Sequence, residues 1–184
     1  MSKLLRLLVV INSVSSAVMC YAGPARKMAI FPHVDSNYFA VQMIVFQLST
    51  VIFGMLWKRK EKLMVKFIAF NAVSEILLYV IAAAVAIQGY VFGYCMIDML
   101  TTALITKSLT FSWFYVIDNN WHDERKHFDI QSSISCSIGT VVGATLAMII
   151  PPTGCLIWIV LPIGIGMDNL LLIYILYTAV KPLK

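Results

Sequence analysis

Charged residues are scarce in this sequence. Only 12% of its 184 residues are Asp, Glu, Lys or Arg, whereas 60% are hydrophobic and the mean hydropathy is +0.86. Soluble globular domains carry about 25% charged residues, so the composition excludes an ordinary soluble domain. Because a membrane-spanning helix needs about 20 largely apolar residues, we expect about six spans and no soluble domain in this sequence.

The signatures of several chemistries are also missing. There is no CxxC pair and no Cys/His cluster at metal-ligand spacing, so we expect no metal and no cofactor. There is no Ser/His/Asp set, no HExxH and no phosphate-binding glycine loop, so we expect neither an enzyme nor an ATP-driven pump. The net charge of +5 comes from cations in short loops rather than from one exposed face, which argues against nucleic-acid binding.

Six apolar segments are present, at about residues 4–22, 38–57, 63–88, 91–117, 130–150 and 155–180. They predict an all-α integral membrane fold that forms one six-helix domain over residues 1–184. The first segment, with Lys3 and Arg6 before its apolar run, also has the layout of a secretory signal. The five apolar segments that follow favour a retained first helix.

Cations predict the orientation of these segments, because short loops rich in Lys and Arg stay in the cytoplasm. Ten cations fall on the side of the basic loop at residues 58–62, whereas Arg26 and Lys27 fall on the other side. Both termini are therefore predicted to be cytoplasmic, and the expected location is a bacterial inner membrane.

Ionisable residues inside a span face a protein interior or a watery cavity. At about 1.5 Å per residue, Glu75 and Asp168 lie about 18 Å and Lys107 about 15 Å from the cytoplasmic side. This shared depth fits either a structural ion pair or a site that binds a charged substrate or relays protons. Asp98 lies nearer the outside. It is either an unpaired carboxylate that desolvation biases towards its protonated form, or a group that reaches water at the outer interface.

Other polar and small residues inside the spans suggest contacts between helices. The amides of Gln42 and Gln47 are expected to face other helices, because lipid cannot pair them. Gly139-x-x-x-Gly143 has a spacing that lets two helices approach closely. The segment from Pro162 to Gly166 predicts an interruption before Asp168, either a broken helix beside a transport site or a plain kink.

The basic loop and the end of the second segment carry a resemblance to a known family. Gly54-x-Leu56-x-x-Arg59-x-x-Lys62 resembles the loop between the second and third helices of the major facilitator superfamily, whose usual form is G-x-L-a-D-R-x-G-R-K. The acid and the second glycine of that form are replaced here by Lys58 and Glu61. Lys107 resembles the basic residue of the family's fourth helix, and the segment from Arg125 to Gly143 is similar to the passage into its fifth.

This resemblance implies that the chain is one half of a secondary active transporter, a small-solute carrier or efflux protein coupled to protons or another ion. A complete carrier of this family has two halves around a central path, so a second copy or a separate six-helix subunit is the implied partner, besides membrane lipid. Gln42, Gln47, Asp98 and Lys107 would then touch the solute or protons. The alternative is a non-transporting accessory or immunity-type membrane protein with the same half-fold.

Overall fold

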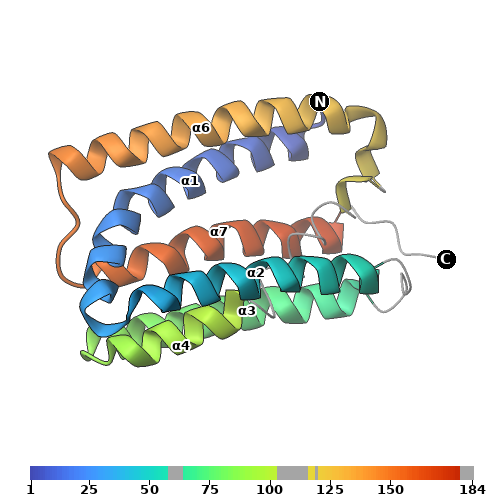
Figure 1. The fold of residues 1–184 in the computed structure, drawn as a ribbon. Coiled ribbons are helices and arrows are strands. Elements are labelled where there is room, and N and C mark those ends of the chain that lie inside the picture. The colour runs from blue at the N-terminus through green and yellow to red at the C-terminus, as the bar shows by residue number, and fades with distance from the viewer. Residues whose placement is uncertain (58–63, 103–115, 119, 179–184) are drawn as a thin grey trace.

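The computed structural model describes residues 1–57, 64–102, 116–118 and 120–178, and these residues are helical apart from short turns, with no strand among them. The elements, labelled as in Figure 1, are α1 (Lys3–Ile30), η1 (Phe31–His33), α2 (Ser36–Trp57), α3 (Met64–Ile87), α4 (Val91–Thr101), η3 (His122–Glu124), α6 (Arg125–Ile149) and α7 (Leu156–Thr178). Within the described residues, four helices are long and apolar enough to cross a bilayer, namely α1, α3, α6 and α7. The predicted all-α, membrane-type fold is therefore present.

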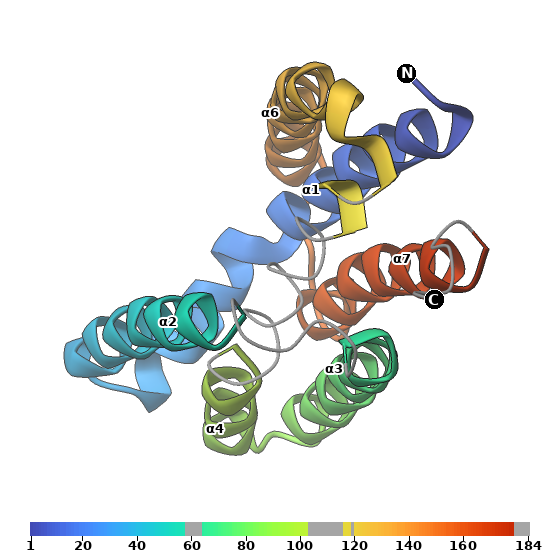
Figure 2. The same ribbon diagram turned by 90° about the vertical axis from the view of Figure 1, so that its right-hand side faces the viewer.

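The helices run alternately up and down along one bundle axis (Figure 1). Helices α1, α3 and α6 begin at the end of the bundle where α2 and α7 finish, and we call this the N-terminal end. In the end-on view, α2, α4, α3 and α7 form an arc (Figure 2). Helix α1 runs along the open side of this arc, and α6 lies beyond α1. Helix α6 packs on α1, and α7 packs on both α1 and α3. Helix α1 is thus the link between α6 and the rest of the bundle.

Helix α1 is longer than the sequence pattern predicts. The first predicted segment ends at about residue 22, but the helix continues through Pro24 to Ile30. Its second half bends towards the start of α2 (Figure 1), as expected where proline removes a backbone donor. The continuation is explained by packing, because Ile30 is buried in a cluster with Ala83 and Trp158.

Helix α6 also begins earlier than predicted, at Arg125 rather than at residue 130. Arg125 forms an ion pair with Asp118, and its Nε lies 3.6 Å from Oδ2 of Asp129, one turn along the helix. Phe128 is buried in the apolar core of the N-terminal end. Charge pairing and one buried ring thus extend the helix into a stretch whose composition predicts a loop.

Helix α7 shows no break at the predicted interruption. It runs continuously from Leu156 to Thr178 with Pro162 inside it. Proline removes one backbone hydrogen bond, which neighbouring helices and local adjustment can offset in a membrane protein. Pro162 and Gly164 are both buried, so this segment is a packed part of the bundle.

The apolar core is divided into two clusters, one at each end of the bundle. The cluster at the N-terminal end is built from α1, α3, α6 and α7 and includes Leu5, Leu8, Ile68, Leu172 and Ile175. The cluster at the opposite end includes Ile30, Ala82, Val91, Cys95 and Trp158. The stretch of bundle between the two clusters contains most of the buried polar side chains.

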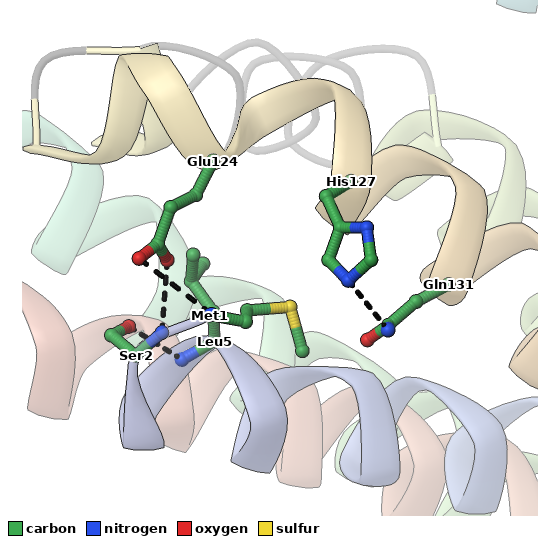
Figure 3. A network of polar contacts seen from close by, with 6 residues as sticks. All are labelled: Met1, Ser2, Leu5, Glu124, His127 and Gln131. Atoms are coloured by element: carbon green, nitrogen blue, oxygen red, sulfur yellow. Dashed lines mark hydrogen bonds and ion pairs between the residues drawn. The ribbon is translucent and has the colours of Figure 1, made fainter.

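The N-terminal end is held by polar contacts between the start of α1 and η3. Glu124 accepts a hydrogen bond from the backbone N–H of Ser2 at 2.9 Å, and its other oxygen lies 3.8 Å from the ammonium group of Met1 (Figure 3). Ser2 caps α1, because its hydroxyl oxygen accepts from the N–H of Leu5 at 3.3 Å. Nearby, the ring of His127 contacts the Gln131 amide at 2.8 Å.

Candidate functional site: a polar layer between two apolar clusters

Eight polar side chains between the two apolar clusters form a group that we call the polar layer. Its members come from α1, α2, α3, α4 and α7: Ser15, Gln42, Glu75, Tyr79, Asp98, Thr102, Asp168 and Asn169. Ser15 and Asp168 each lie twelve residues from the start of their own helix, which is about 18 Å at the rise of an α-helix. Because α1 and α7 begin at opposite ends of the bundle, both residues lie near mid-height.

Helices α3 and α7 are joined in this layer by Glu75 and Asn169. The Asn169 side-chain amide donates to Oε2 of Glu75 at 2.7 Å and lies 3.4 Å from the carbonyl oxygen of Ala72. Glu75 and Asn169 are each only 3% exposed. Asn71, one helical turn from Glu75, is buried as well, as expected for residues on the same face of a helix.

Helices α1 and α7 are joined by Ser15 and Asp168. The Ser15 hydroxyl lies 2.9 Å from Oδ2 of Asp168 and 3.1 Å from the carbonyl oxygen of Gly164. A Cβ on Gly164 would lie 3.1 Å from the Met19 side chain, so the absence of a side chain there allows α1 to approach. The second carboxylate oxygen of Asp168, Oδ1, is buried and has no hydrogen-bond partner among the described residues.

A pocket of about 330 Å³ lies beside Asp168, between α1, α6 and α7. The side chains that line it include Asn12, Ser15, Ser16, Cys136, Thr140 and Asp168. The same three helices also line an apolar pocket of about 430 Å³ that contains none of the polar layer. Of these two pockets, the 330 Å³ pocket combines a carboxylate with neutral hydrogen-bonding groups.

Helices α2 and α4 are joined by Gln42 and Asp98. The Gln42 amide donates to Oδ2 of Asp98 at 2.8 Å, so of the two alternatives for Asp98, an unpaired carboxylate does not agree with the structure. The Tyr79 hydroxyl interacts with the same carboxylate and lies 3.2 Å from the Thr102 hydroxyl. The positive charge of Arg26, in the part of α1 beyond Pro24, also acts on Asp98. Arg26 belongs to the part of α1 that extends past the predicted end of the first segment.

The other predicted site residues are distributed as follows. Gln47 is exposed on α2, so the expectation that its amide faces another helix is wrong. The face of α2 that points inwards carries Tyr38, Gln42 and Ser49 instead. Gly54 and Leu56 lie in the last turn of α2. Arg59, Lys62 and Lys107 lie outside the described residues.

The negative charge of Glu75 acts on Asp168, so these two of the three charges predicted at one depth do lie near each other.

Gly139 and Gly143 of α6 lie directly against the backbone of α1. A Cβ at Gly139 would lie 2.1 Å from the carbonyl oxygen of Ser13, and one at Gly143 would lie 2.1 Å from that of Ala17. Polar bonds accompany this contact, since the Ser13 hydroxyl donates to the carbonyl oxygen of Ser135 at 2.8 Å. The amide of Asn12 donates to the Ser132 hydroxyl at 3.2 Å. The α1–α6 contact thus depends on the lack of side chains at two positions.

Four members of the polar layer were missed in the sequence, namely Ser15, Tyr79, Thr102 and Asn169, and so was Arg26, which acts on Asp98. Each stands next to or within an apolar run, so a search for every polar residue inside the spans would have found Ser15 and Asn169. Arg26 required knowing that α1 passes through Pro24. Among the described residues, no group of three or more His, Cys, Asp or Glu side chains is placed to hold a metal ion.

Comparison of the chain with protein-family models, with curated proteins and with solved structures finds no match.

Proposed function

We propose that this chain is a multi-pass membrane protein that forms one half of a secondary carrier for a small solute, coupled to protons or another ion. The observation that carries the proposal is the Gln42–Asp98 pair, whose 2.8 Å hydrogen bond joins α2 to α4 inside otherwise apolar helices. Inserting an ionisable side chain into a span costs about 2.5–3.5 kcal/mol on insertion scales. A structural role alone therefore explains such a residue poorly. Carboxylates at such depth are typical of substrate and proton pathways.

The surroundings of Asp98 suit a binding and release step. Its carboxylate interacts with two neutral donors, Gln42 and Tyr79, and with the positive charge of Arg26 on another helix. A proton or a charged solute that reaches Asp98 would weaken the attraction to Arg26, which lies beyond the bend of α1. Binding at Asp98 would therefore be coupled to the position of the second half of α1.

The proposed topology has six spans, with α2 and the predicted segment 91–117 added to the four helices that are long and apolar enough. Helix α2 has 22 residues, enough for a bilayer of about 30 Å. The N-terminal end of the bundle carries Lys3, Arg6, Arg125 and Lys126, and by the positive-inside rule these cations support the proposal that both termini are cytoplasmic. A bacterial inner membrane is the proposed location.

A second half is part of the proposal, because six helices enclose only one side of a central path. Helix α2 presents an apolar face to its surroundings, made of Val41, Ile44, Leu48, Val51 and Ile52. We propose that a second copy of the chain covers this face. The resemblance of the 54–62 segment to the major facilitator superfamily supports the same arrangement.

One observation favours the alternative, a non-transporting accessory protein. The Glu75–Asn169 and Ser15–Asp168 bonds each tie two helices together, which is what a purely structural layer requires. Such a protein would act by binding another membrane protein and would move no solute. We propose no enzymatic activity for the chain.

The proposal is tested by replacing Asp98 with Asn, which keeps the size of the side chain and removes its charge. The protein is reconstituted into liposomes that enclose a pH-sensitive dye, and proton movement is followed while small amines, acids and sugars are added outside. We expect Asp98→Asn to abolish any solute-driven proton movement without lowering the amount of protein in the membrane. Asp123→Asn, at an exposed position in η3, is the control that should retain wild-type movement.

Two results would count against this role. Undiminished proton movement in the Asp98→Asn protein would remove Asp98 from the mechanism. Wild-type liposomes that move no proton with any of these solutes, although the protein is folded, would favour the accessory alternative.

A further inference from the structure

The Asp168 carboxylate has fewer hydrogen bonds than a buried carboxylate needs. Oδ1 is buried without a partner among the described residues, and Oδ2 has the Ser15 hydroxyl at 2.9 Å. That hydroxyl has a single proton, and it also lies 3.1 Å from the carbonyl oxygen of Gly164. The two acceptors therefore share one donor, whereas an ionised carboxylate offers about four acceptor sites. A donor from outside the chain would complete the set.

The space for such a donor is the 330 Å³ pocket that Asp168 helps to line. Its volume lies within the range of about 300–1,000 Å³ that is usual for small-molecule sites. Ser16 and Thr140 contribute hydroxyl groups and Asn12 an amide, whereas Met19 and Ile165 contribute apolar surface. No Lys, Arg or His lines the pocket among the described residues, so Asp168 determines its charge.

We propose that this pocket binds a small organic cation with a primary ammonium group, and that Asp168 is its counter-ion. An ammonium group carries three donors, which match the Asp168 carboxylate and two of the neutral oxygens that line the pocket. Charge-assisted hydrogen bonds of this kind are stronger than neutral ones. The alkyl part of the ligand lies against Met19 and Ile165.

The size of the pocket favours an organic cation over a bare metal ion. A water molecule takes up about 30 Å³ in the liquid, so a single metal ion would leave most of the pocket to water. A short alkylammonium ion fills more of it and covers the apolar wall. One negative charge beside neutral oxygens also matches a monovalent ligand, since divalent ions usually collect several carboxylates.

This site is separate from the one on which the proposed transport rests. Asp98 and Gln42 belong to α4 and α2, whereas the pocket is built from α1, α6 and α7. Binding can be measured in detergent without any flux, so failure of one proposal leaves the other standing.

The native cysteines give a direct test. Cys136 lines the pocket, whereas Cys155 is exposed just before the start of α7 and does not line it. The purified full chain is treated with methyl methanethiosulfonate, and the rate of modification at each cysteine is followed by peptide mass spectrometry. The reaction is repeated with n-butylammonium chloride, with n-butanol, and with sodium chloride at matched ionic strength.

We expect n-butylammonium to slow modification of Cys136 and to leave Cys155 unchanged. At about ten times the dissociation constant roughly a tenth of the pockets remain free, so the rate should fall about tenfold. n-Butanol and sodium chloride should have little effect. Asp168→Asn should abolish the protection, and the exposed Asp123→Asn control should keep it.

Two outcomes overturn the proposal. Equal protection by n-butanol would show that the pocket selects apolar volume and not charge, and no protection by n-butylammonium at any soluble concentration would show that it binds no such cation. Both comparisons use the wild-type protein, so they decide the matter even if Asp168→Asn folds poorly.

Discussion

At the scale of single residues, the polar layer consists of carboxylates held by neutral donors from other helices. Ser15, Gln42 and Asn169 each donate to an acid on a different helix. In hydrocarbon an unsatisfied polar group is unfavourable by several kcal/mol, so each donor fixes the rotation of its helix as well as its position. The layer therefore determines how the helices face one another at mid-height.

Replacing Ser15 with Ala should destabilise the protein, because it removes the donor shared by Asp168 and Gly164. Hydrogen bonds between membrane helices contribute about 0.6 kcal/mol on average and up to about 1.7 kcal/mol. We expect the free energy of unfolding to fall by about 0.5–2 kcal/mol. Unfolding by sodium dodecyl sulfate in mixed micelles would measure the change.

The matched control for this substitution is Ser137→Ala. Ser137 is exposed, and its hydroxyl bonds the carbonyl oxygen of Ser133 within its own helix at 2.9 Å. Its removal should change the stability by less than about 0.5 kcal/mol. If both substitutions had the same effect, the Ser15 contact would not hold α1 against α7.

The sequence predicts which residues of the polar layer share a helical face, but it does not predict their partners. Asn71 and Glu75 are one turn apart and both buried, as that spacing indicates. The partner of Glu75 is Asn169, which stands next to the predicted residue Asp168 and about 100° around the same helix. Which of two adjacent residues meets which neighbour depends on helix rotation, and rotation depends on packing across the whole bundle.

At the scale of elements, α1 has a different kind of contact with each of its neighbours. It meets α6 through Gly139 and Gly143 and meets α7 through Ser15 and Asp168. Its last turns, beyond Pro24, join the apolar cluster of the opposite end through Ile30.

Replacing Gly139 with Ala should weaken the α1–α6 contact. The added methyl group would meet the carbonyl oxygen of Ser13 at 2.1 Å, so the two helices must separate. Overpacking of a tight contact typically destabilises by about 1–3 kcal/mol. The same unfolding measurement in mixed micelles applies.

Gly166 provides the control with the opposite expectation. It also lies within a helix, but a Cβ there would have no atom within 4 Å. Because Ala is a better helix former than Gly by about 0.5–1 kcal/mol, Gly166→Ala should be neutral or stabilising. Equal destabilisation by both changes would contradict the close approach of α6 to α1.

The ends of the helices were harder to predict than their presence. Each of the six predicted apolar segments coincides with a described helix, although the structure describes the fourth only from Val91 to Thr101. The errors lie at residue 22, where Gly23 and Pro24 indicate a stop, and at residue 130, where a polar stretch indicates a loop. Burial of Ile30 and Phe128 extends both helices, and burial against distant segments is not visible in local sequence.

At the scale of the whole molecule, the distribution of charge and the alternation of the helices indicate the same orientation in the membrane. The starts of α1 and α6, which carry Lys3, Arg6, Arg125 and Lys126, lie at the same end of the bundle (Figure 1). The turn between α6 and α7, from Pro151 to Cys155, lies at the other end and carries no charge.

This arrangement predicts which positions a membrane-impermeant maleimide can reach. In spheroplasts of a bacterial host, the exposed thiol of Cys155 should react from outside, whereas a Lys126→Cys substitution should add a reactive thiol only after lysis. Cys155→Ser removes the first signal and serves as its control. The opposite pattern would contradict the proposed orientation: the Lys126→Cys thiol would react in intact spheroplasts, and Cys155 would react only after lysis.

The central claim, that this chain is half of a carrier, is tested most directly by the oligomeric state of the purified protein in a mild detergent. The account predicts a stable dimer, with twice the mass of the 20.6 kDa chain, or a second six-helix subunit that co-purifies with it. A second half is required because a complete carrier of the family that the chain resembles has two halves around a central path. A monomer of 20.6 kDa with no partner would contradict the carrier and leave the accessory role in its place.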